Sequence, residues 1–401
     1  MILRARTVVT MNGAPIENGA VAISGQQITD VGNFAEVKAR NAGEIIDLGE
    51  QALLPGLINA HCHLDYTCLR GKIAPQKSFT DWIRAINAEK AGLSNDDYCA
   101  SINAGSVEAK KFGTTTIANL TAFPELIPSI QSPIRTFWFA EMIDVRQPER
   151  AKEIVDRAVD SLRLTEHGGL APHAPYTASA NLYRCAEEAA RRENFLLTTH
   201  LAESSEEMQM FFDRGGPLHD FLTDIGRDMS DLSGVTPTEQ LSAVCTFDER
   251  WLLVHLNELL PSDFELLAAL SNKPQIVHCP RSHRYFGHSR FPLAKFRELG
   301  FNISLGTDSL ASNGDLSLFA EMRALQETEP ALSPEEILKM VTVNSAGALQ
   351  LADKVGQIRP SLLADLIAVP FNLSAKNVFT EIVASGKSVP WMMIGGKIAA
   401  F

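Results

Sequence analysis

Two histidines that stand two positions apart are the first residues whose spacing suggests chemistry. His61 and His63 flank Cys62 and follow Leu53–Ala60, an apolar run typical of a buried strand. Because side chains alternate between the faces of a strand, both imidazoles point to one side and Cys62 to the other. The pair could hold a metal ion, or it could be two polar residues at the end of a strand, and by itself it does not decide between these interpretations.

Polar residues also end three later apolar runs. His200 follows Phe195–Thr199, His255 follows Trp251–Val254, and Asp308 follows Ile303–Gly306. Histidine and carboxylate ligands with one open position are typical of a catalytic zinc site. Such residues at four strand ends are much harder to attribute to chance than one histidine pair. The pattern therefore predicts a metal centre.

A carboxylate stands close to one of these residues in the chain. Glu203 follows His200 by three positions, and residues three apart share a face if a helical turn begins there. Glu203 would then lie beside the metal as a general acid and base without being a ligand. The alternative is a solvated glutamate at a helix start, where acidic residues are favoured. The neighbouring His200 favours catalysis.

The elements that must bring these residues together alternate along the middle of the chain. Runs expected as strands are Leu53–Ala60, Thr114–Leu120, Arg135–Met142, Gly169–Pro172, Phe195–Thr199, Trp251–Val254, Gln275–Val277 and Ile303–Gly306. Amphipathic stretches between them predict helices, as at Ala151–Leu164, Leu182–Arg192, Ser262–Leu270 and Leu293–Leu299. Eight alternations favour an α/β fold of the (β/α)8 TIM-like barrel type. The carboxyl ends of barrel strands meet on one face, so the candidate ligands would converge.

Both chain ends have a different pattern, with short strand-like runs and turns. These runs are Thr7–Met11, Ala20–Ser24, Ile28–Val31, Ala364–Val369, Val378–Ala384 and Trp391–Ile398. Neither end is large enough to be stable alone, so we expect them to join in one small β-sandwich domain. The predicted domains are 1–53 and 359–401 for the two parts of the β domain and 54–358 for the barrel.

The composition is that of an acidic globular protein. The chain has 401 residues, of which 45% are hydrophobic and 21% charged, and 36 Lys and Arg against 48 Asp and Glu give a net charge of −12. This charge argues against nucleic acid and anionic membranes as partners. No run reaches the roughly 18 apolar residues that span a bilayer. Six cysteines without a CxxC pair predict reduced thiols and a cytoplasmic protein.

Taken together, the motifs resemble the amidohydrolase superfamily. The nearer similarity is to its cytosine deaminase, guanine deaminase and chlorohydrolase-like branch, which includes adenosylhomocysteine, methylthioadenosine and aminodeoxyfutalosine-type deaminases. The resemblance covers nearly the whole chain. It rests on Leu54-Pro55-Gly56-Leu57-Ile58-Asn59-Ala60-His61-Cys62-His63, Gly113-Thr114-Thr115-Thr116, Pro172-His173-Ala174-Pro175-Tyr176-Thr177, His200-Leu201-Ala202-Glu203, Leu305-Gly306-Thr307-Asp308-Ser309 and the stretch from Val355-Gly356-Gln357-Ile358 to Ala364-Asp365-Leu366.

The resemblance implies one divalent metal ion, zinc first and iron second. Its ligands would be His61, His63, His200 and Asp308. His255 and Asp308 would orient the attacking water and take its proton, and Glu203 would protonate a ring nitrogen of the substrate. His173 would bind the substrate, and Trp82, in an aromatic segment after the first strand, would stack on its heterocycle. Relatives are commonly dimers or tetramers, so a homo-oligomer is expected.

The loop after the seventh strand departs from the family pattern Asn-Pro-x-Ser-Asn. It reads His278-Cys279-Pro280-Arg281-Ser282-His283, with Arg284 and His288 following. If this cationic loop faces the substrate, Arg281 and His283 would contact it, and Arg281 or Arg284 would suit an anionic group such as a carboxylate. The alternative is a solvated basic loop on an acidic protein.

Specificity for adenine nucleosides is not settled by the motifs. The glutamate of adenosine-type deaminases is matched only loosely by Glu89, and Glu141 stands where an arginine would be expected. The leading hypothesis is a metal-dependent aminohydrolase that deaminates an aminated N-heterocycle, such as that of an adenine nucleoside, and releases ammonia. The alternatives are dechlorination or other C–N cleavage on a triazine-like ring, and a catalytically inactive metal-binding scaffold.

Overall fold

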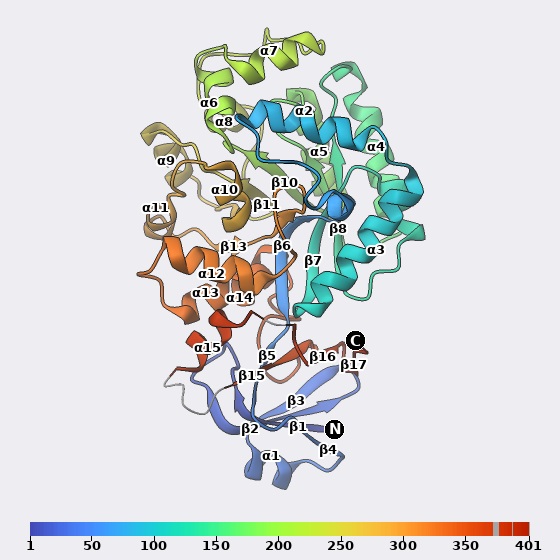
Figure 1. Cartoon of the computed structure of the whole chain (residues 1–401), viewed down its shortest axis with the longest axis vertical. Helices are drawn as coiled ribbons and strands as arrows, with labels where there is room; N and C mark the ends of the chain where they lie inside the picture. Colours follow the sequence, from blue (N-terminus) through green and yellow to red (C-terminus); the bar gives the residue numbers. More distant parts are fainter. Residues whose placement is uncertain (372–376, 387, 401) are drawn as a thin grey trace.

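A barrel and a smaller β domain make up the molecule. The computed structural model describes residues 1–371, 377–386 and 388–400. The barrel forms the larger upper part in Figure 1, and both chain ends lie in the β domain below it. The prediction of a (β/α)8 TIM-like barrel with a β domain built from both chain ends is confirmed. Among the helices of the described residues, none has the length and apolar character needed to cross a bilayer.

Nine parallel strands form the barrel wall. They are β6 (Leu57–His63), β7 (Thr114–Thr121), β8 (Arg135–Met142), β9 (Gly168–Pro172), β10 (Leu196–Leu201), β11 (Trp251–His255), β12 (Gln275–His278), β13 (Ile303–Leu305) and β14 (Asp308–Ser309). Neighbours pair in chain order from β6 to β13. The short β14 follows directly and pairs with β6, where Asp308 lies opposite Cys62. This pairing returns the sheet to its first strand and closes the barrel.

Helices surround the barrel (Figure 1). They are α2 (Phe79–Lys90), α3 (Asn95–Lys111), α4 (Ala151–Leu162), α5 (Ala180–Glu193), α6 (Ser205–Phe212), α7 (Pro217–Asp224), α8 (Pro237–Ser242), α9 (Pro261–Ala268), α10 (Pro280–Phe286), α11 (Leu293–Glu298), α12 (Leu318–Thr328), α13 (Pro334–Met340) and α14 (Val343–Ala348), with 3-10 turns at Leu64–Leu69, Pro124–Ser129 and Pro148–Arg150. Serine hydroxyls cap several of them, as Ser94 does for α3 and Ser204 for α6. These caps satisfy amides that have no partner within the helix.

The β domain is one eight-stranded sheet. It contains β1 (Ile2–Val8), β2 (Ile16–Ser24), β3 (Gln27–Asn33), β4 (Ile45–Asp47), β5 (Gln51–Pro55), β15 (Leu366–Pro370), β16 (Trp391–Ile394) and β17 (Lys397–Ile398), with α1 (Phe34–Arg40) beside it. The two chain ends meet where β5 pairs antiparallel with β15. The single predicted strand Leu53–Ala60 is therefore divided between β5 and β6. Gly56 stands at the division, and a Cβ atom there would collide with Thr115.

One predicted strand is a helix instead. Residues Val378–Ala384 form α15, and the Asn377 side chain caps it by accepting a hydrogen bond from the amide of Phe379. The buried residues Val378, Phe379, Ile382 and Val383 recur at helical spacing. β-branched and aromatic residues had favoured a strand, but the apolar face at period three to four and the cap favour a helix.

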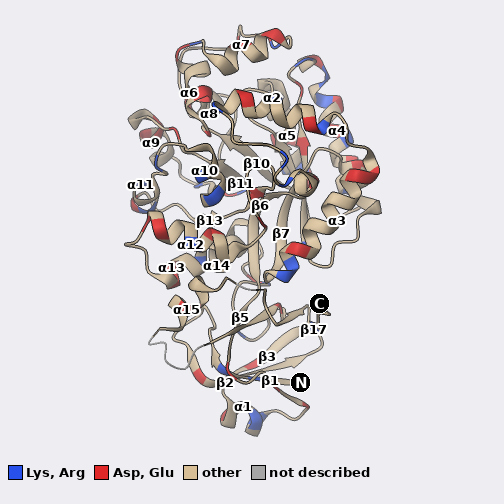
Figure 2. Cartoon of the chain, viewed as in Figure 1, with Lys and Arg blue, Asp and Glu red and all other residues tan. Residues whose placement is uncertain are grey.

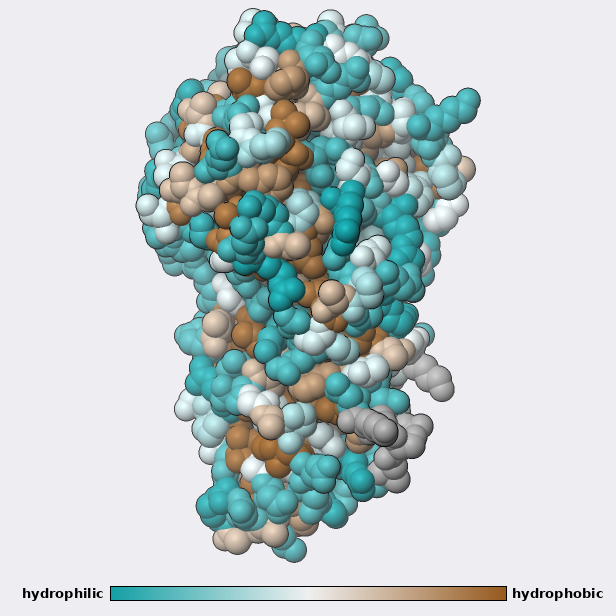
Figure 3. All heavy atoms as spheres, turned by 90° about the vertical axis from the view of Figure 1, so that its left-hand side faces the viewer, coloured by the Kyte–Doolittle hydropathy of each residue, from teal (hydrophilic) through white to brown (hydrophobic). Residues whose placement is uncertain are grey.

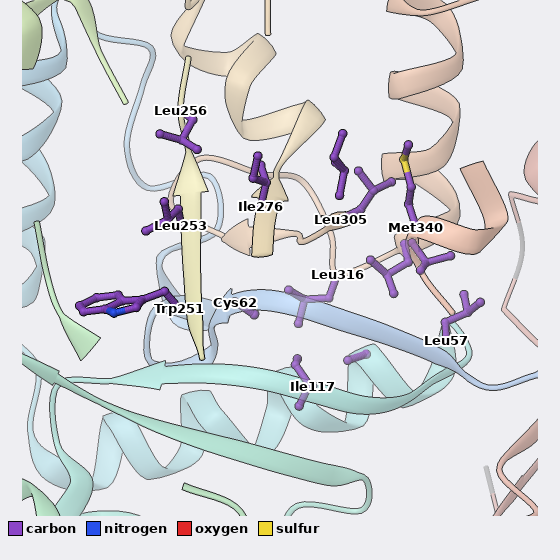
Figure 4. Close-up of a cluster of buried hydrophobic side chains, with 14 of the residues drawn as sticks. Leu57, Cys62, Ile117, Trp251, Leu253, Leu256, Ile276, Leu305, Leu316 and Met340 are labelled. Carbon is purple, nitrogen blue, oxygen red and sulfur yellow. The ribbon is translucent and has the colours of Figure 1, made fainter. Parts of the chain in front are cut away.

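Buried side chains lie on both faces of the barrel strands. Figure 4 shows Cys62, Ile117, Leu253 and Ile276 among the side chains of the largest core cluster, which includes residues of the outer helices. The alternate strand residues, such as Ile58, Ala118, Leu252 and Val277, belong to a second cluster that includes α14 and that we assign to the barrel interior. Charged side chains of both signs are spread over the surface helices (Figure 2). On the face that Figure 3 shows, apolar residues form patches between the hydrophilic ones.

Candidate metal centre and active site

Five predicted site residues converge at the carboxyl ends of the barrel strands. The ring of His61 lies among those of His63, His200 and His255, with centroids 4.9, 5.0 and 5.9 Å away. The Nε2 atoms of His63 and His200 are 3.2 Å apart. Asp308 completes the cluster, with its Oδ1 atom 3.7 Å from His61 Nε2 and 3.9 Å from His63 Nε2.

The donor set of this cluster fits a divalent metal ion. Both ring nitrogens of His61 are buried and lack a hydrogen-bond partner among the described residues, which is costly unless a ligand satisfies them. Candidate ligand atoms of His61, His63 and Asp308 lie within 4.8 Å of one another, as do those of His61, His200 and His255. Burial holds the pKa of His63 well below its usual 6.5, so its imidazole is neutral at pH 7, as metal binding requires.

Neighbouring groups fix the orientation of two of these side chains. His200 Nδ1 donates to the backbone carbonyl of His173 at 2.8 Å, which leaves Nε2 free to face the cluster. Asp308 Oδ2 accepts a hydrogen bond of 2.6 Å from the Ser282 hydroxyl, and Oδ1 accepts one of 2.8 Å from the amide of Ser309. These contacts hold the imidazole and the carboxylate in the geometry of a preformed site.

The backbone at the strand ends is held in an uncommon conformation. Ala202, His255, Leu256 and Asp308 have φ angles of 50, 79, 49 and 55°, in the left-handed region that side chains disfavour. Such residues cost about 1–3 kcal/mol each and cluster at functional sites. Hydrogen bonds of 2.9 Å from the Leu256 amide to the Leu201 carbonyl and from the Asn257 amide to the Ala202 carbonyl join the turns after β10 and β11.

Glu203 lies beside the cluster, although not for the predicted reason. No helical turn begins at His200, because β10 continues to Leu201 and α6 begins only at Ser205. Instead, the positive φ at Ala202 redirects the chain, and the Glu203 amide donates to Glu207 Oε2 at 2.7 Å. Glu203 Oε1 then lies 3.6 Å from His255 Nε2 with its side chain only 7% exposed.

The surroundings of Glu203 suit proton transfer. Burial raises the pKa of its carboxyl from 4.5 to about 8, so it can carry a proton near neutral pH. Candidate ligand atoms of Glu203, His255 and Asp308 lie within 4.8 Å of one another. A second histidine, His288, has its Nε2 atom 3.9 Å from Glu203 Oε1.

A cavity of about 530 Å³ opens onto the cluster and is large enough for a nucleoside-sized molecule. Of the expected substrate-binding residues, Trp82 and His173 line it, together with Glu203 and His255. Trp82 lies on α2 and packs edge-on against Phe286 with ring centroids 4.9 Å apart. His173 Nδ1 shares a hydrogen bond of 2.6 Å with the Thr177 hydroxyl. Apolar residues also line the cavity, namely Ile83, Ile86, Ile143, Val145, Phe221 and Ile225.

Comparison with known proteins places this site in a family. Residues 52–398 match the amidohydrolase family. The chain belongs to the amidohydrolase family. The 5-methylthioadenosine/S-adenosylhomocysteine deaminase of Pyrococcus furiosus is 30% identical to this chain over an alignment of 421 positions. The alignment covers 99% of this chain and 94% of that protein.

Solved structures of similar fold agree with this assignment. The Helicobacter pylori aminofutalosine deaminase has a TM-score of 0.89 at 22% identity, with 100% of both chains covered. An adenosine deaminase from Xanthomonas campestris with bound zinc has a TM-score of 0.83 at 24% identity, with 99% of this chain and 92% of that chain covered. At these identities the similarity establishes the fold of this amidohydrolase.

Two expected substrate contacts lie elsewhere in the amidohydrolase. Arg281 and His283 lie on α10 and do not line the cavity at the cluster. Arg281 Nη1 is 2.5 Å from Asp315 Oδ1 and 3.9 Å from Glu321 Oε1, and His283 Nε2 donates to the Ser289 carbonyl at 2.7 Å. The cationic groups of this segment are engaged by nearby acidic and carbonyl groups. The geometry therefore favours the alternative of a structural basic segment, and the expected contact of Arg281 and His283 with substrate stays a prediction.

Several residues in or near the cavity received no role in the sequence analysis. Glu141 at the end of β8 and Asn87, Lys90 and Arg146 line the cavity. Glu141 had a usable signal, because it stands near a strand end like the candidate ligands. His288 does not line this cavity but follows the loop that the sequence analysis singled out, and the path of the chain after α10 brings it to Glu203.

Proposed function

We propose that this amidohydrolase is a metal-dependent aminohydrolase that converts an adenine-type N-heterocycle of a nucleoside to the oxo form and releases ammonia. The observation that carries the proposal is the buried Glu203 carboxylate beside His255 and Asp308, at the cluster and in the wall of the cavity. The curated relative from Pyrococcus furiosus, named as a deaminase of adenine nucleosides, supports this substrate class.

His61, His63, His200 and Asp308 are the proposed ligands of one metal ion. When bound, the ion would lower the pKa of a water molecule and so supply a nucleophile at neutral pH. Zinc is the proposed metal, because three imidazoles and a carboxylate suit it and the adenosine deaminase from Xanthomonas campestris binds zinc. Iron is the second possibility.

The residues of the chain then move the protons. His255 and Asp308 hold the attacking water opposite the ring carbon that bears the amino group. Glu203 donates the proton that it carries to the ring nitrogen beside that carbon, while His255 and Asp308 take one proton of the water. The Glu203 carboxylate then transfers the proton of the new hydroxyl group to the departing amino group, and the proton held by His255 and Asp308 restores Glu203. One water is consumed and one ammonia is released. Burial strengthens each of these electrostatic contacts because water is excluded from the site.

His173 and Trp82 are the proposed substrate-binding residues. His173 lines the cavity beside His200, with ring centroids 4.9 Å apart, and can contact the heterocycle as it approaches the cluster. Trp82 offers an aromatic ring in the cavity wall for stacking.

Asp308→Asn should remove metal and turnover together.

Glu203→Gln tests the reaction most directly. The variant keeps the shape of the side chain but cannot transfer protons, so we expect kcat for ammonia release from adenosine or 5′-methylthioadenosine to fall at least about 100-fold. Bound zinc, measured by elemental analysis, should stay at the wild-type amount. Wild-type protein that holds metal but releases no ammonia from any aminated heterocycle would refute the proposal and favour an inactive scaffold. Residual activity near the wild-type value would remove Glu203 from the mechanism.

Location, assembly and domain limits are further proposals. All six cysteines are free thiols, which supports a reducing compartment such as the cytoplasm. We also propose a homo-oligomer that acts on a small molecule rather than on nucleic acid or membranes. The proposed domain limits are 1–53, 54–358 and 359–401.

A further inference from the structure

The helix α2 supplies a large part of the cavity wall. The residues of α2 that line the cavity are Phe79, Trp82, Ile83, Ile86, Asn87 and Lys90. In Figure 1, α2 runs across the upper part of the molecule, below α7. Trp82 can stack on a substrate only if α2 is held at a fixed place beside the cluster.

One side chain outside α2 holds the first turn of this helix. Glu206 Oε1 accepts a hydrogen bond of 3.0 Å from the amide of Phe79, and Oε2 accepts one of 3.0 Å from the amide of Thr80. Oε2 also accepts a hydrogen bond from the Thr80 hydroxyl, and Thr80 is fully buried. Among the residues that the structure describes, no other hydrogen bond or ion pair joins α2 to another element. The carboxylate thus satisfies amides that the start of a helix leaves free and fastens α2 to α6.

The same turn of α6 also contacts the segment of the proton carrier. Glu206 and Glu207 are neighbours in the first turn of α6, and Glu207 Oε2 accepts the hydrogen bond of 2.7 Å from the Glu203 amide. One helical turn therefore holds both the segment of Glu203 and the helix of Trp82. Its backbone fixes the place of the proposed stacking ring relative to the proton carrier.

The surroundings of Trp82 suit a ligand. Its ring packs against Phe79 and Phe286, with centroids 6.0 and 4.9 Å away. Its Nε1 atom is buried and has no hydrogen-bond partner among the described residues. A buried donor without an acceptor costs free energy that an acceptor on a ligand can offset. Because Trp82 follows Phe79 by three positions on one face of α2, a shift of the first turn would move the ring.

We propose that Glu206 is a positioning residue, which holds the first turn of α2 so that Trp82 lies where the heterocycle of a substrate stacks. The inference rests on the proposed function, because that function supplies the heterocycle. Glu206 itself does not line the cavity. Its loss should therefore raise KM through Trp82 and leave the proton transfers nearly as fast.

A double-mutant cycle tests this dependence on Trp82. KM and kcat for adenosine or 5′-methylthioadenosine would be measured with wild type, Glu206→Gln, Trp82→Ala and the double variant. We expect Glu206→Gln to raise KM about 10-fold, as for lost hydrogen bonds to a charged group, and to change kcat less than about 3-fold. Trp82→Ala should raise KM about 10-fold in the wild-type background but less than about 3-fold in Glu206→Gln. Equal effects of Trp82→Ala in both backgrounds overturn the proposal.

Glu336→Gln is the matched control. The Glu336 carboxylate accepts hydrogen bonds from the amide and the hydroxyl of Ser333 at the start of α13, a helix that does not line the cavity. Both glutamine variants should lose stability in urea unfolding, but only Glu206→Gln should raise KM. A similar rise of KM in Glu336→Gln overturns the proposal, because it would attribute the effect to a general loss of stability. If Glu206→Gln does not fold, Thr80→Val removes only the hydroxyl donor and should raise KM about 3-fold, and an unchanged KM in that variant overturns the proposal.

Acrylamide quenching of Trp82 fluorescence examines the position of the ring without turnover. The signal of Trp82 is the difference between each protein and its Trp82→Phe counterpart. Glu206→Gln should make quenching of this signal at least about 2-fold more efficient, because α2 opens more readily once it is unfastened. Unchanged quenching overturns the proposal, whether or not the enzyme deaminates adenosine. Increased quenching in a protein that releases no ammonia from any aminated heterocycle would refute the proposed function and still support Glu206 as the residue that positions α2.

Discussion

Replacing Arg281 by glutamine should lower stability and leave substrate binding intact. Its guanidinium lies 3.9 Å from the fully buried carboxylate of Glu321 and 2.5 Å from Asp315. Two unit charges at the longer distance interact by about 4 kcal/mol at an effective dielectric constant of about 20. Because the Arg281 side chain is 23% exposed, solvent screens part of this attraction, and we expect a loss of about 2 kcal/mol when both groups are charged.

The size of this loss should depend on pH, through Glu321. Burial raises the pKa of Glu321 to about 8, against the lowering influence of Arg281. Between the unfolded value of 4.5 and about 8, the folded state holds a proton that the unfolded state has released, so this carboxyl lowers stability as the pH rises through that range. At pH 6 Glu321 is protonated and gains little from the arginine. At pH 9 Glu321 is charged, and its attraction to Arg281 offsets more of the free-energy cost of burying that charge.

Urea unfolding at pH 6 and pH 9, together with KM at neutral pH, checks this reasoning. Arg281→Gln should lose about 2 kcal/mol at pH 9 and less than about 1 kcal/mol at pH 6, with KM unchanged within about 2-fold. Arg284→Gln is the control, since its pair with Glu327 is exposed and should contribute less than about 0.5 kcal/mol. A KM raised about 10-fold in Arg281→Gln with unchanged stability would refute the structural role and restore the substrate contact.

Three other outcomes follow from the packing and the site. Asn257→Ala removes the 2.9 Å hydrogen bond from Asn257 Nδ2 to the Glu203 carbonyl. We expect kcat to fall about 10-fold, with KM and metal content unchanged. A kcat equal to that of the wild type would show that the turn holds Glu203 in place without this hydrogen bond. Removal of metal by a chelator should lower the thermal midpoint, and zinc should restore it, because an ion at about 100 times its Kd contributes about 2.7 kcal/mol to the folded state alone. Phe296→Ala should lower the free energy of unfolding in urea by about 3–5 kcal/mol, because Phe296 is fully buried. Phe212→Ala should lower it by less than about 1 kcal/mol, because Phe212 is 47% exposed. Similar losses in the two variants would contradict the assigned core.

Local sequence patterns were enough to predict the barrel and the candidate metal-binding cluster. The spacing of His61 and His63 places both on one strand face, and strand-end positions mark His200, His255 and Asp308. Such patterns are readable because strand alternation depends on the immediate chain, and because a parallel barrel brings all carboxyl ends together.

Non-local contacts decided what the patterns could not. Val378–Ala384 became α15 through the Asn377 cap and the packing of its apolar face. The register of β6 on β7 shifts between Asn59 and Cys62, which no period-two pattern would reveal. In β6, pairing with a distant strand outweighed the local pattern, whereas in α15 the local cap and the helical spacing agree with the packing of its apolar face.

Residue type and spacing were thus sufficient for the class of fold, the set of candidate metal ligands and the candidate proton carrier Glu203. Only the tertiary structure decided which polar side chains are already engaged and which face the cavity. Arg281 is paired with residues more than 30 positions away, whereas Glu141 and His288 reach the cluster from separate parts of the chain. The physical reason is that alternation and capping act over a few residues, whereas burial and charge pairing depend on neighbours that only the closed barrel brings into contact.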